Sequence, residues 1–161
     1  MAASRIRITR DKAELVRSLV DSTETTGPFQ TYADAIAFAA ALGFRHKKRS
    51  PLDGSISSEP SPISLDVFVT RGHFPELELL AIATAQNPAI LSTFDAEAEA
   101  QRITLFEEYA NGGLELLRDE LRGAVDYAER ILLLLTNERL REDKPEGEEF
   151  DLNRFLSMNS E

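Results

Sequence analysis

The stretch from Tyr32 to Leu42 constrains the fold most, because it is almost entirely Ala, Ile, Phe and Leu. Thr31, with Asp34 three positions later, is typical of a helix start that is capped by a side chain. A helix that is apolar nearly all round needs burial on more than one side, and 49 residues are too few to provide it. We therefore expect this helix to self-associate or to dock onto the C-terminal part of the chain.

The first residues alternate between apolar and polar side chains, which predicts a short strand with one buried face. Ile6 and Ile8 would face inward, and Arg5, Arg7 and Thr9 would face outward. A helix, a turn and the apolar helix are expected to follow. The order strand, helix, turn, helix is that of a ribbon–helix–helix module, in which two chains pair their strands and present the ribbon to the DNA major groove.

The rest of the chain predicts mainly helices. The expected fold class is mainly α, with a basic ribbon–helix–helix-like module over residues 1–49, a Ser- and Pro-rich linker over 50–62, an acidic α-helical domain over 63–141 and an acidic, loose tail over 142–161. Within the helical domain, Asp95 is expected to cap a long helix. The sequence Asn111-Gly112-Gly113 favours a turn after that helix, and a hinge or a site of close backbone approach is the alternative.

Charge is distributed unevenly along the chain. Residues 1–49 carry nine Lys or Arg against five Asp or Glu, a balance of +4, whereas residues 50–161 carry nine against 23, a balance of −14. The basic run at residues 45–49 follows the apolar helix, with Gly43 expected to cap its C-terminus. These cations either follow DNA phosphates or compensate the helix dipole in a solvated loop. The candidate DNA-binding residues are Arg5, Arg7, Thr9, Arg45, Lys47, Lys48 and Arg49.

Several kinds of chemistry find no support in the sequence. There is no Cys, so disulfides and thiolate sites are excluded. The two histidines, His46 and His73, lack partners at metal-ligand spacing, and the acidic residues follow helical charge patterns. No phosphate-binding loop or apolar run of transmembrane length is present. We expect a cytoplasmic protein, not an enzyme, with no catalytic residue, no metal and no cofactor.

Three blocks carry a resemblance to a known family. They are Arg5–Ile8 with the helix after it, Pro28–Tyr32 leading into Phe38–Phe44, and Phe106–Leu114, which is the most specific. On these blocks the chain resembles the small family of dnd system-associated protein four. The resemblance implies a bacterial accessory protein of DNA phosphorothioation (dnd) modification and restriction, with protein components of that system as partners and no catalytic residue to carry over.

Two functions remain open from the sequence. The first is a DNA-binding accessory or regulator of a dnd system that forms a homo-oligomer through its N-terminal module. The second is a protein–protein interaction adaptor of the same defence system that does not contact DNA. The net charge of −10 favours the second, because repulsion from DNA would have to be overcome locally.

Overall fold

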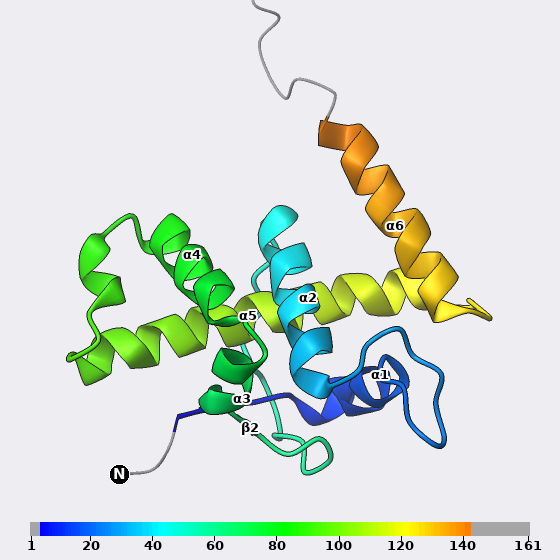
Figure 1. Cartoon of the computed structure of the whole chain (residues 1–161), viewed down its shortest axis with the longest axis horizontal. Helices are drawn as coiled ribbons and strands as arrows, with labels where there is room; N and C mark the ends of the chain where they lie inside the picture. The colour runs from blue at the N-terminus through cyan, green and yellow to red at the C-terminus, as the bar shows by residue number, and fades with distance from the viewer. Residues whose placement is uncertain (1–3, 143–161) are drawn as a thin grey trace, which may run out of the picture.

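A computed structural model describes residues 4–142 of the chain, and it is mainly helical (Figure 1). The predicted acidic tail over 142–161 lies outside the described residues from residue 143 onward. None of the helices in the described part combines the length and the apolar character that crossing a membrane requires. In chain order the elements are β1 (Arg5–Ile6), the 3₁₀ helix η1 (Arg10–Lys12), α1 (Ala13–Ser18), α2 (Tyr32–Arg45), β2 (Ile63–Ser64), α3 (Leu65–Thr70), α4 (Phe74–Ala85), the 3₁₀ helix η2 (Pro88–Leu91), α5 (Ala96–Leu121) and α6 (Tyr127–Glu142).

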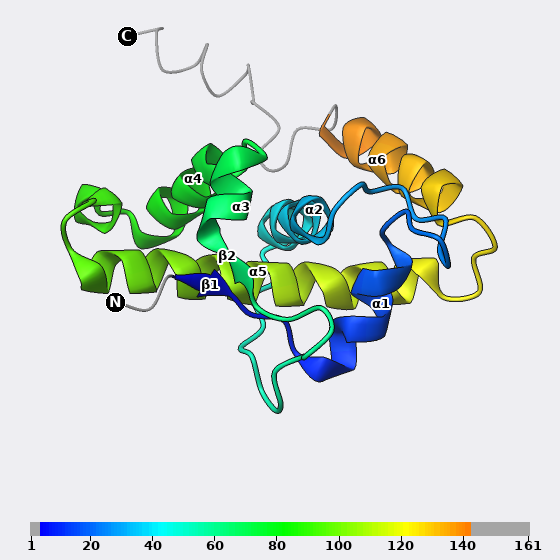
Figure 2. The same ribbon diagram turned by 60° about the horizontal axis from the view of Figure 1, so that its bottom comes forward.

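The apolar helix α2 crosses the long helix α5, and this crossing organises the fold. Thr31 caps α2 by accepting a hydrogen bond from the Asp34 backbone N–H at 3.2 Å, as its sequence predicts. Figure 2 shows α2 lying across α5, with α3 and α4 on one side and α1 and α6 on the other. The expected docking of α2 onto the C-terminal part of the chain is confirmed.

The crossing depends on glycine. Asn111-Gly112-Gly113 forms neither a turn nor a hinge, since it lies inside the continuous helix α5. A Cβ atom at Gly113 would lie 1.7 Å from the carbonyl oxygen of Ala39, and one at Gly43 would lie 2.1 Å from that of Tyr109. Close backbone approach, the alternative interpretation of the glycine pair, is therefore correct. Gly43 likewise lies inside α2 and does not cap it, because the helix continues to Arg45.

The first strand pairs within the chain. β1 runs antiparallel to β2, with Arg5 opposite Ser64 and Ile6 opposite Ile63. On the way to α1, the Arg7 backbone N–H donates to Glu107 Oε2 at 2.7 Å. The alternation predicted that this strand would pair with the same strand of a second chain. That prediction is wrong, because residues 63–64 of the same chain pair with it. The alternation over residues 63–69 fits either a short strand or a turn of helix, and the structure has both, because the two-residue strand β2 passes directly into α3.

The Ser- and Pro-rich segment 50–62 packs along the N-terminal residues and α5. Asn111 Nδ2 donates to the backbone carbonyl oxygens of Ser50 at 3.2 Å and Pro51 at 3.1 Å. The Ser57 backbone N–H donates to Ile8 O at 2.7 Å, and Ser57 is buried. Backbone groups along this segment therefore find partners in both halves of the chain.

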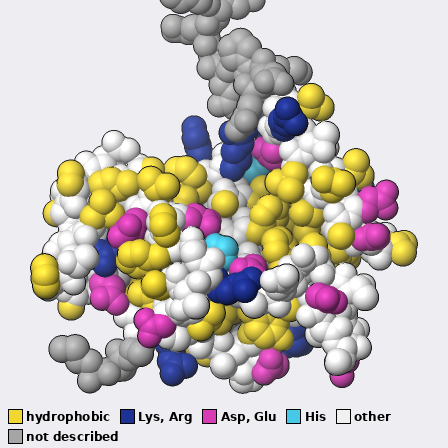
Figure 3. All heavy atoms as spheres, in the orientation of Figure 1, with side chains coloured by type: hydrophobic (Ala, Val, Ile, Leu, Met, Phe, Trp, Pro, Cys, Tyr) yellow, Lys and Arg dark blue, Asp and Glu magenta, His cyan; other side chains and the backbone are white. Residues whose placement is uncertain are grey.

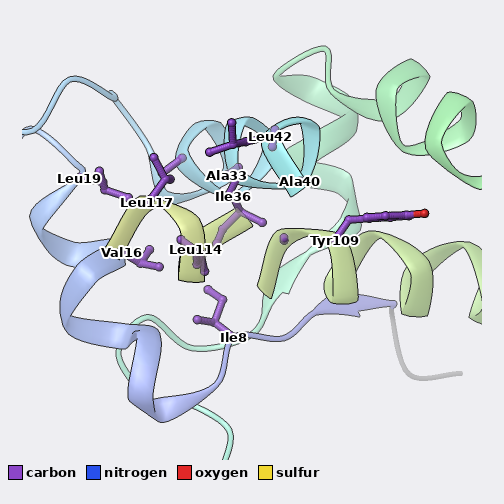
Figure 4. Packing of buried hydrophobic residues seen from close by; sticks show 14 of the residues in the cluster. Ile8, Val16, Leu19, Ala33, Ile36, Ala40, Leu42, Tyr109, Leu114 and Leu117 are labelled. Carbon is purple, nitrogen blue, oxygen red and sulfur yellow. The ribbon is translucent and has the colours of Figure 1, made fainter. Parts of the chain in front are cut away.

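One hydrophobic core draws on residues from both sides of that segment. Figure 4 shows the side chains of α1, α2 and α5 converging, and Ile8 from the N-terminal segment joins them. The largest fully buried side chains are Phe68, Phe106, Ile6, Leu19, Ile36, Leu77, Leu114, Leu117 and Val16. The N-terminal segment and the acidic helices consequently share their main hydrophobic cluster.

Replacing Gly113 by Ala tests the crossing. Alanine normally stabilises a helix interior by about 1 kcal/mol relative to glycine. Here we expect a net loss of about 1–3 kcal/mol in the free energy of unfolding, because the new Cβ meets backbone atoms that cannot rotate away.

Urea denaturation followed by circular dichroism measures the change. Thr104→Ala on the exposed side of the same helix is the control, with an expected gain of no more than ~0.5 kcal/mol. A Gly113→Ala variant that is as stable as the control or more stable would contradict the close approach.

Candidate functional site

The basic side chains of the N-terminal half lie against carboxylates of the acidic half. Arg7 Nε donates to Glu107 Oε2 at 2.9 Å, and Arg7 Nη2 donates to Glu107 Oε1 at 3.0 Å. The side chain of Glu107 is 2% exposed, whereas that of Arg7 is 52% exposed. The hydrogen bond and the charge of Glu107 both raise the pKa of Arg7. This two-bond geometry satisfies a buried carboxylate that would otherwise lack a counter-charge.

The first part of the basic run contacts α6. Arg45 Nε donates to Glu138 Oε2 at 3.1 Å, and His46 Nε2 lies 2.5 Å from Glu138 Oε1. Burial by itself would raise the pKa of Glu138, but hydrogen bonds from Arg45 and His46 outweigh it and lower the pKa. The end of α2 is therefore fastened to α6 by charge.

The second part of the run contacts α5. Lys48 Nζ lies 3.3 Å from Glu115 Oε2, and Arg49 Nε lies 2.5 Å from Glu108 Oε2. Lys12, whose side chain is buried, brings its Nζ within 3.7 Å of Glu115 Oε1. Burial would raise the pKa of Glu115, but hydrogen bonds from Ser50 and Lys48 and the charges of both lysines lower it. The acidic face of α5 thus neutralises cations from two separate segments.

The three remaining candidate residues differ in their exposure to solvent. Thr9 is 2% exposed, and its Oγ1 donates to Asn111 Oδ1 at 3.4 Å, so its predicted outward orientation is wrong. Arg5 is exposed, and its guanidinium donates to the Pro62 carbonyl oxygen at 3.4 Å. Lys47 is exposed and has no ion pair among residues 4–142. The structure thus distributes these residues over several places without forming a single patch of free cations.

A second polar cluster lies where α2 meets the start of α4. Asp34 accepts hydrogen bonds from Arg71 Nε at 3.2 Å and Nη2 at 2.5 Å, and its Oδ1 lies 2.7 Å from His73 Nε2. Burial opposes ionisation of Asp34, yet the hydrogen bonds from Arg71, His73 and Thr31 hold its pKa well below the usual range. Asp34 therefore stays charged and anchors the loop between α3 and α4 to α2.

Glu76 lies in the first turn of α4 and differs from Asp34 in its hydrogen bonding. Its Oε1 is closed off from solvent and accepts no hydrogen bond from any residue that the structure describes. Burial raises the pKa of Glu76 to about 7, and the nearby His73 opposes that rise. Glu76 lines a groove of about 550 Å³ whose other walls are mostly apolar.

Sequence reasoning missed this groove. Among these residues the sequence analysis weighed only His73, as a possible metal ligand, and Asp34 lies 39 residues from it in the chain. Within residues 4–142 no group of three or more His, Cys, Asp or Glu is placed to hold a metal ion. The one local signal was the spacing of His73 and Glu76 at the start of a helix, which does not by itself indicate a groove.

Fold and surface together define a mainly helical protein in which a basic N-terminal segment is neutralised by acidic helices of its own chain. The chain belongs to the family described as DNA sulphur modification system-associated protein 4, which it matches over residues 5–155. No protein with a curated description and no solved structure matches it. The resemblance to the dnd-associated family is confirmed, and membership indicates an accessory role in a DNA sulphur modification system.

Arg7 and Arg5 provide a matched test of which basic residues are structural. Arg7→Ala leaves the buried Glu107 carboxylate with a backbone N–H alone, so we expect a loss of about 1–3 kcal/mol in the free energy of unfolding. Arg5→Ala removes an exposed side chain and is expected to change it by less than ~0.5 kcal/mol. Urea denaturation of both variants measures the difference, and equal stabilities would contradict a structural role for the Arg7–Glu107 pair.

Proposed function

We propose that this chain is a non-enzymatic adaptor in the cytoplasm that joins protein components of a bacterial DNA sulphur modification system. The observation that carries the proposal is the use of basic side chains inside the molecule. Arg7, Arg45, Lys48 and Arg49 each face a carboxylate of α5 or α6. These are four of the seven residues from which DNA contact was expected.

Internal pairing weakens the electrostatic basis for DNA binding. Affinity for a phosphate backbone comes largely from Lys and Arg that displace condensed counter-ions. A cation already held by a carboxylate contributes less, since the phosphate must compete with that partner or approach its negative charge. The net charge of −10 adds repulsion at long range. An acidic accessory protein of this kind is better suited to a protein partner.

Direct DNA contact is the second candidate, and the exposure of the paired arginines favours it. The side chains of Arg45 and Arg49 are 42% and 43% exposed. A guanidinium has five N–H groups, so one that binds a carboxylate keeps donors for a phosphate. Arg5, Arg7, Lys47 and Lys48 complete this proposed set, from which buried Thr9 is dropped.

A homo-oligomer is a further part of the proposal. The face of α6 that points away from the core exposes four leucines, namely Leu132, Leu133, Leu135 and Leu140. Ile131 and Leu134 of the same helix are buried in the core. Several exposed large apolar side chains on one helix are uncommon on a monomer, and they support contact with a second copy.

Two binding measurements on the full chain separate the candidates. Fluorescence anisotropy with duplex DNA, with and without phosphorothioate, is read over a salt series that starts near about 50 mM. Co-purification with each protein component of the modification system is measured in parallel. The adaptor predicts a stable protein complex and no DNA binding even at the lowest salt.

Charge-reversal variants show whether any DNA binding in this assay depends on the exposed cations after α2. Lys47→Glu reverses an exposed cation that has no ion pair within residues 4–142, and Arg122→Glu, just beyond the C-terminal end of α5, is the control. DNA binding that falls linearly in log salt and is lost in Lys47→Glu alone would contradict the adaptor and put direct contact in its place.

A further inference from the structure

The groove between α2 and the start of α4 has an apolar floor and one polar wall. Its apolar lining includes Phe29, Ala37, Phe38 and Ala41. The rings of Phe29 and Phe38 pack against each other with centroids 5.3 Å apart, and both are only half-buried. Ala41 is exposed, so its small side chain leaves the groove open. Such a surface suits an aromatic or aliphatic side chain of an incoming segment.

In the polar wall, one carboxylate oxygen receives no donor from residues 4–142. Arg71 and His73 both bind Asp34, and Glu76 Oε1 is left with no hydrogen bond from residues 4–142. A buried acceptor without a partner costs free energy, which is recovered when a donor from a ligand reaches it. A cationic donor gains most, because it also restores the charged form of a carboxyl whose pKa burial has raised to about 7.

We propose that this groove binds a segment of a partner protein in which an aromatic or aliphatic side chain lies next to a Lys or Arg. The apolar side chain fills the space over Phe29, Phe38 and Ala41, and the basic side chain reaches Glu76. This inference rests on the proposed adaptor function and names the surface and the chemistry through which the adaptor binds.

Charge complementarity selects a basic segment of another protein as the occupant. The chain carries a net charge of −10, so a basic partner is attracted to it at long range. Many of its own cations already face carboxylates within the chain, as Arg7, Arg45 and Arg49 do. Figure 3 shows hydrophobic side chains gathered over α4 and between α2 and α6, with acidic and histidine side chains between these two areas.

A peptide array tests the proposal directly. Short peptides tiled across the protein components of the modification system serve as the probe, and the labelled full chain is the ligand. We expect the bound peptides to share an aromatic or aliphatic residue within two positions of a Lys or Arg. Affinities of the best peptides are then measured by fluorescence anisotropy for the wild type and for two pairs of variants.

Each groove variant has a matched control on the same protein. Ala41→Arg places a long cation at the mouth of the groove, and Ala83→Arg makes the same change at an exposed alanine of α4 that does not line it. Glu76→Gln removes the ionisable carboxyl from the groove, and Glu78→Gln makes the same change two residues away, outside the groove. Both groove variants should weaken peptide binding at least about tenfold, and both controls should leave it within about twofold.

The possible outcomes separate a failure of the groove proposal from a failure of the adaptor proposal. Co-purification that persists in Ala41→Arg and Glu76→Gln, or bound peptides without a basic residue, would overturn the groove proposal while leaving the adaptor intact. An array without binding, together with no co-purification, would overturn both. A concentration-dependent dimer that Ala41→Arg abolishes would also overturn the proposal, because it would assign the groove to a second copy.

Discussion

The close crossing of α2 over α5 is the contact on which the rest of the structure depends. At Gly43 and Gly113 the two helices approach so closely that a Cβ atom would meet backbone carbonyl groups of the other helix. This proximity buries most of an alanine-rich helix whose sequence requires burial on more than one side. Residues 1–49 alone are too few to provide that burial. Asn111, in the same turn of α5, holds the chain beyond α2 through the carbonyl groups of Ser50 and Pro51.

The same crossing determines the electrostatics of the molecule. Because α2 lies across α5, the basic run at its end meets Glu108 and Glu115, and α6 adds Glu138. Opposite charges in the two halves of the sequence therefore stabilise the contact between those halves. The charge asymmetry that predicts an anionic ligand therefore has an explanation within the chain. Glu76 Oε1 at the apolar groove, in contrast, accepts no hydrogen bond from residues 4–142.

Local signals in the sequence predicted the helices better than their contacts. Thr31 and Asp95 cap α2 and α5 as expected, because capping depends on residues within one turn. The turn predicted at Asn111-Gly112-Gly113 was wrong, because glycine is equally suited to a turn and to a close contact between helices. Only the position of α2 in the folded chain distinguishes the two. Thr9 and the partner of β1 were wrong for a similar reason, since Asn111 and β2 are distant in sequence. The groove was missed because Asp34 and His73 meet only in the folded chain.

These contacts predict that the chain folds as one cooperative unit, in which acidic helices hold the N-terminal basic segment. Native-state hydrogen exchange measures this cooperativity most directly. We predict that backbone amides of α2 near Ala39 and of α5 near Leu114 open with the same free energy, and that Gly113→Ala lowers this free energy equally for both. Amides of α2 that keep their protection while those of α5 lose it would contradict the account, because residues 1–49 would then fold as a module of their own.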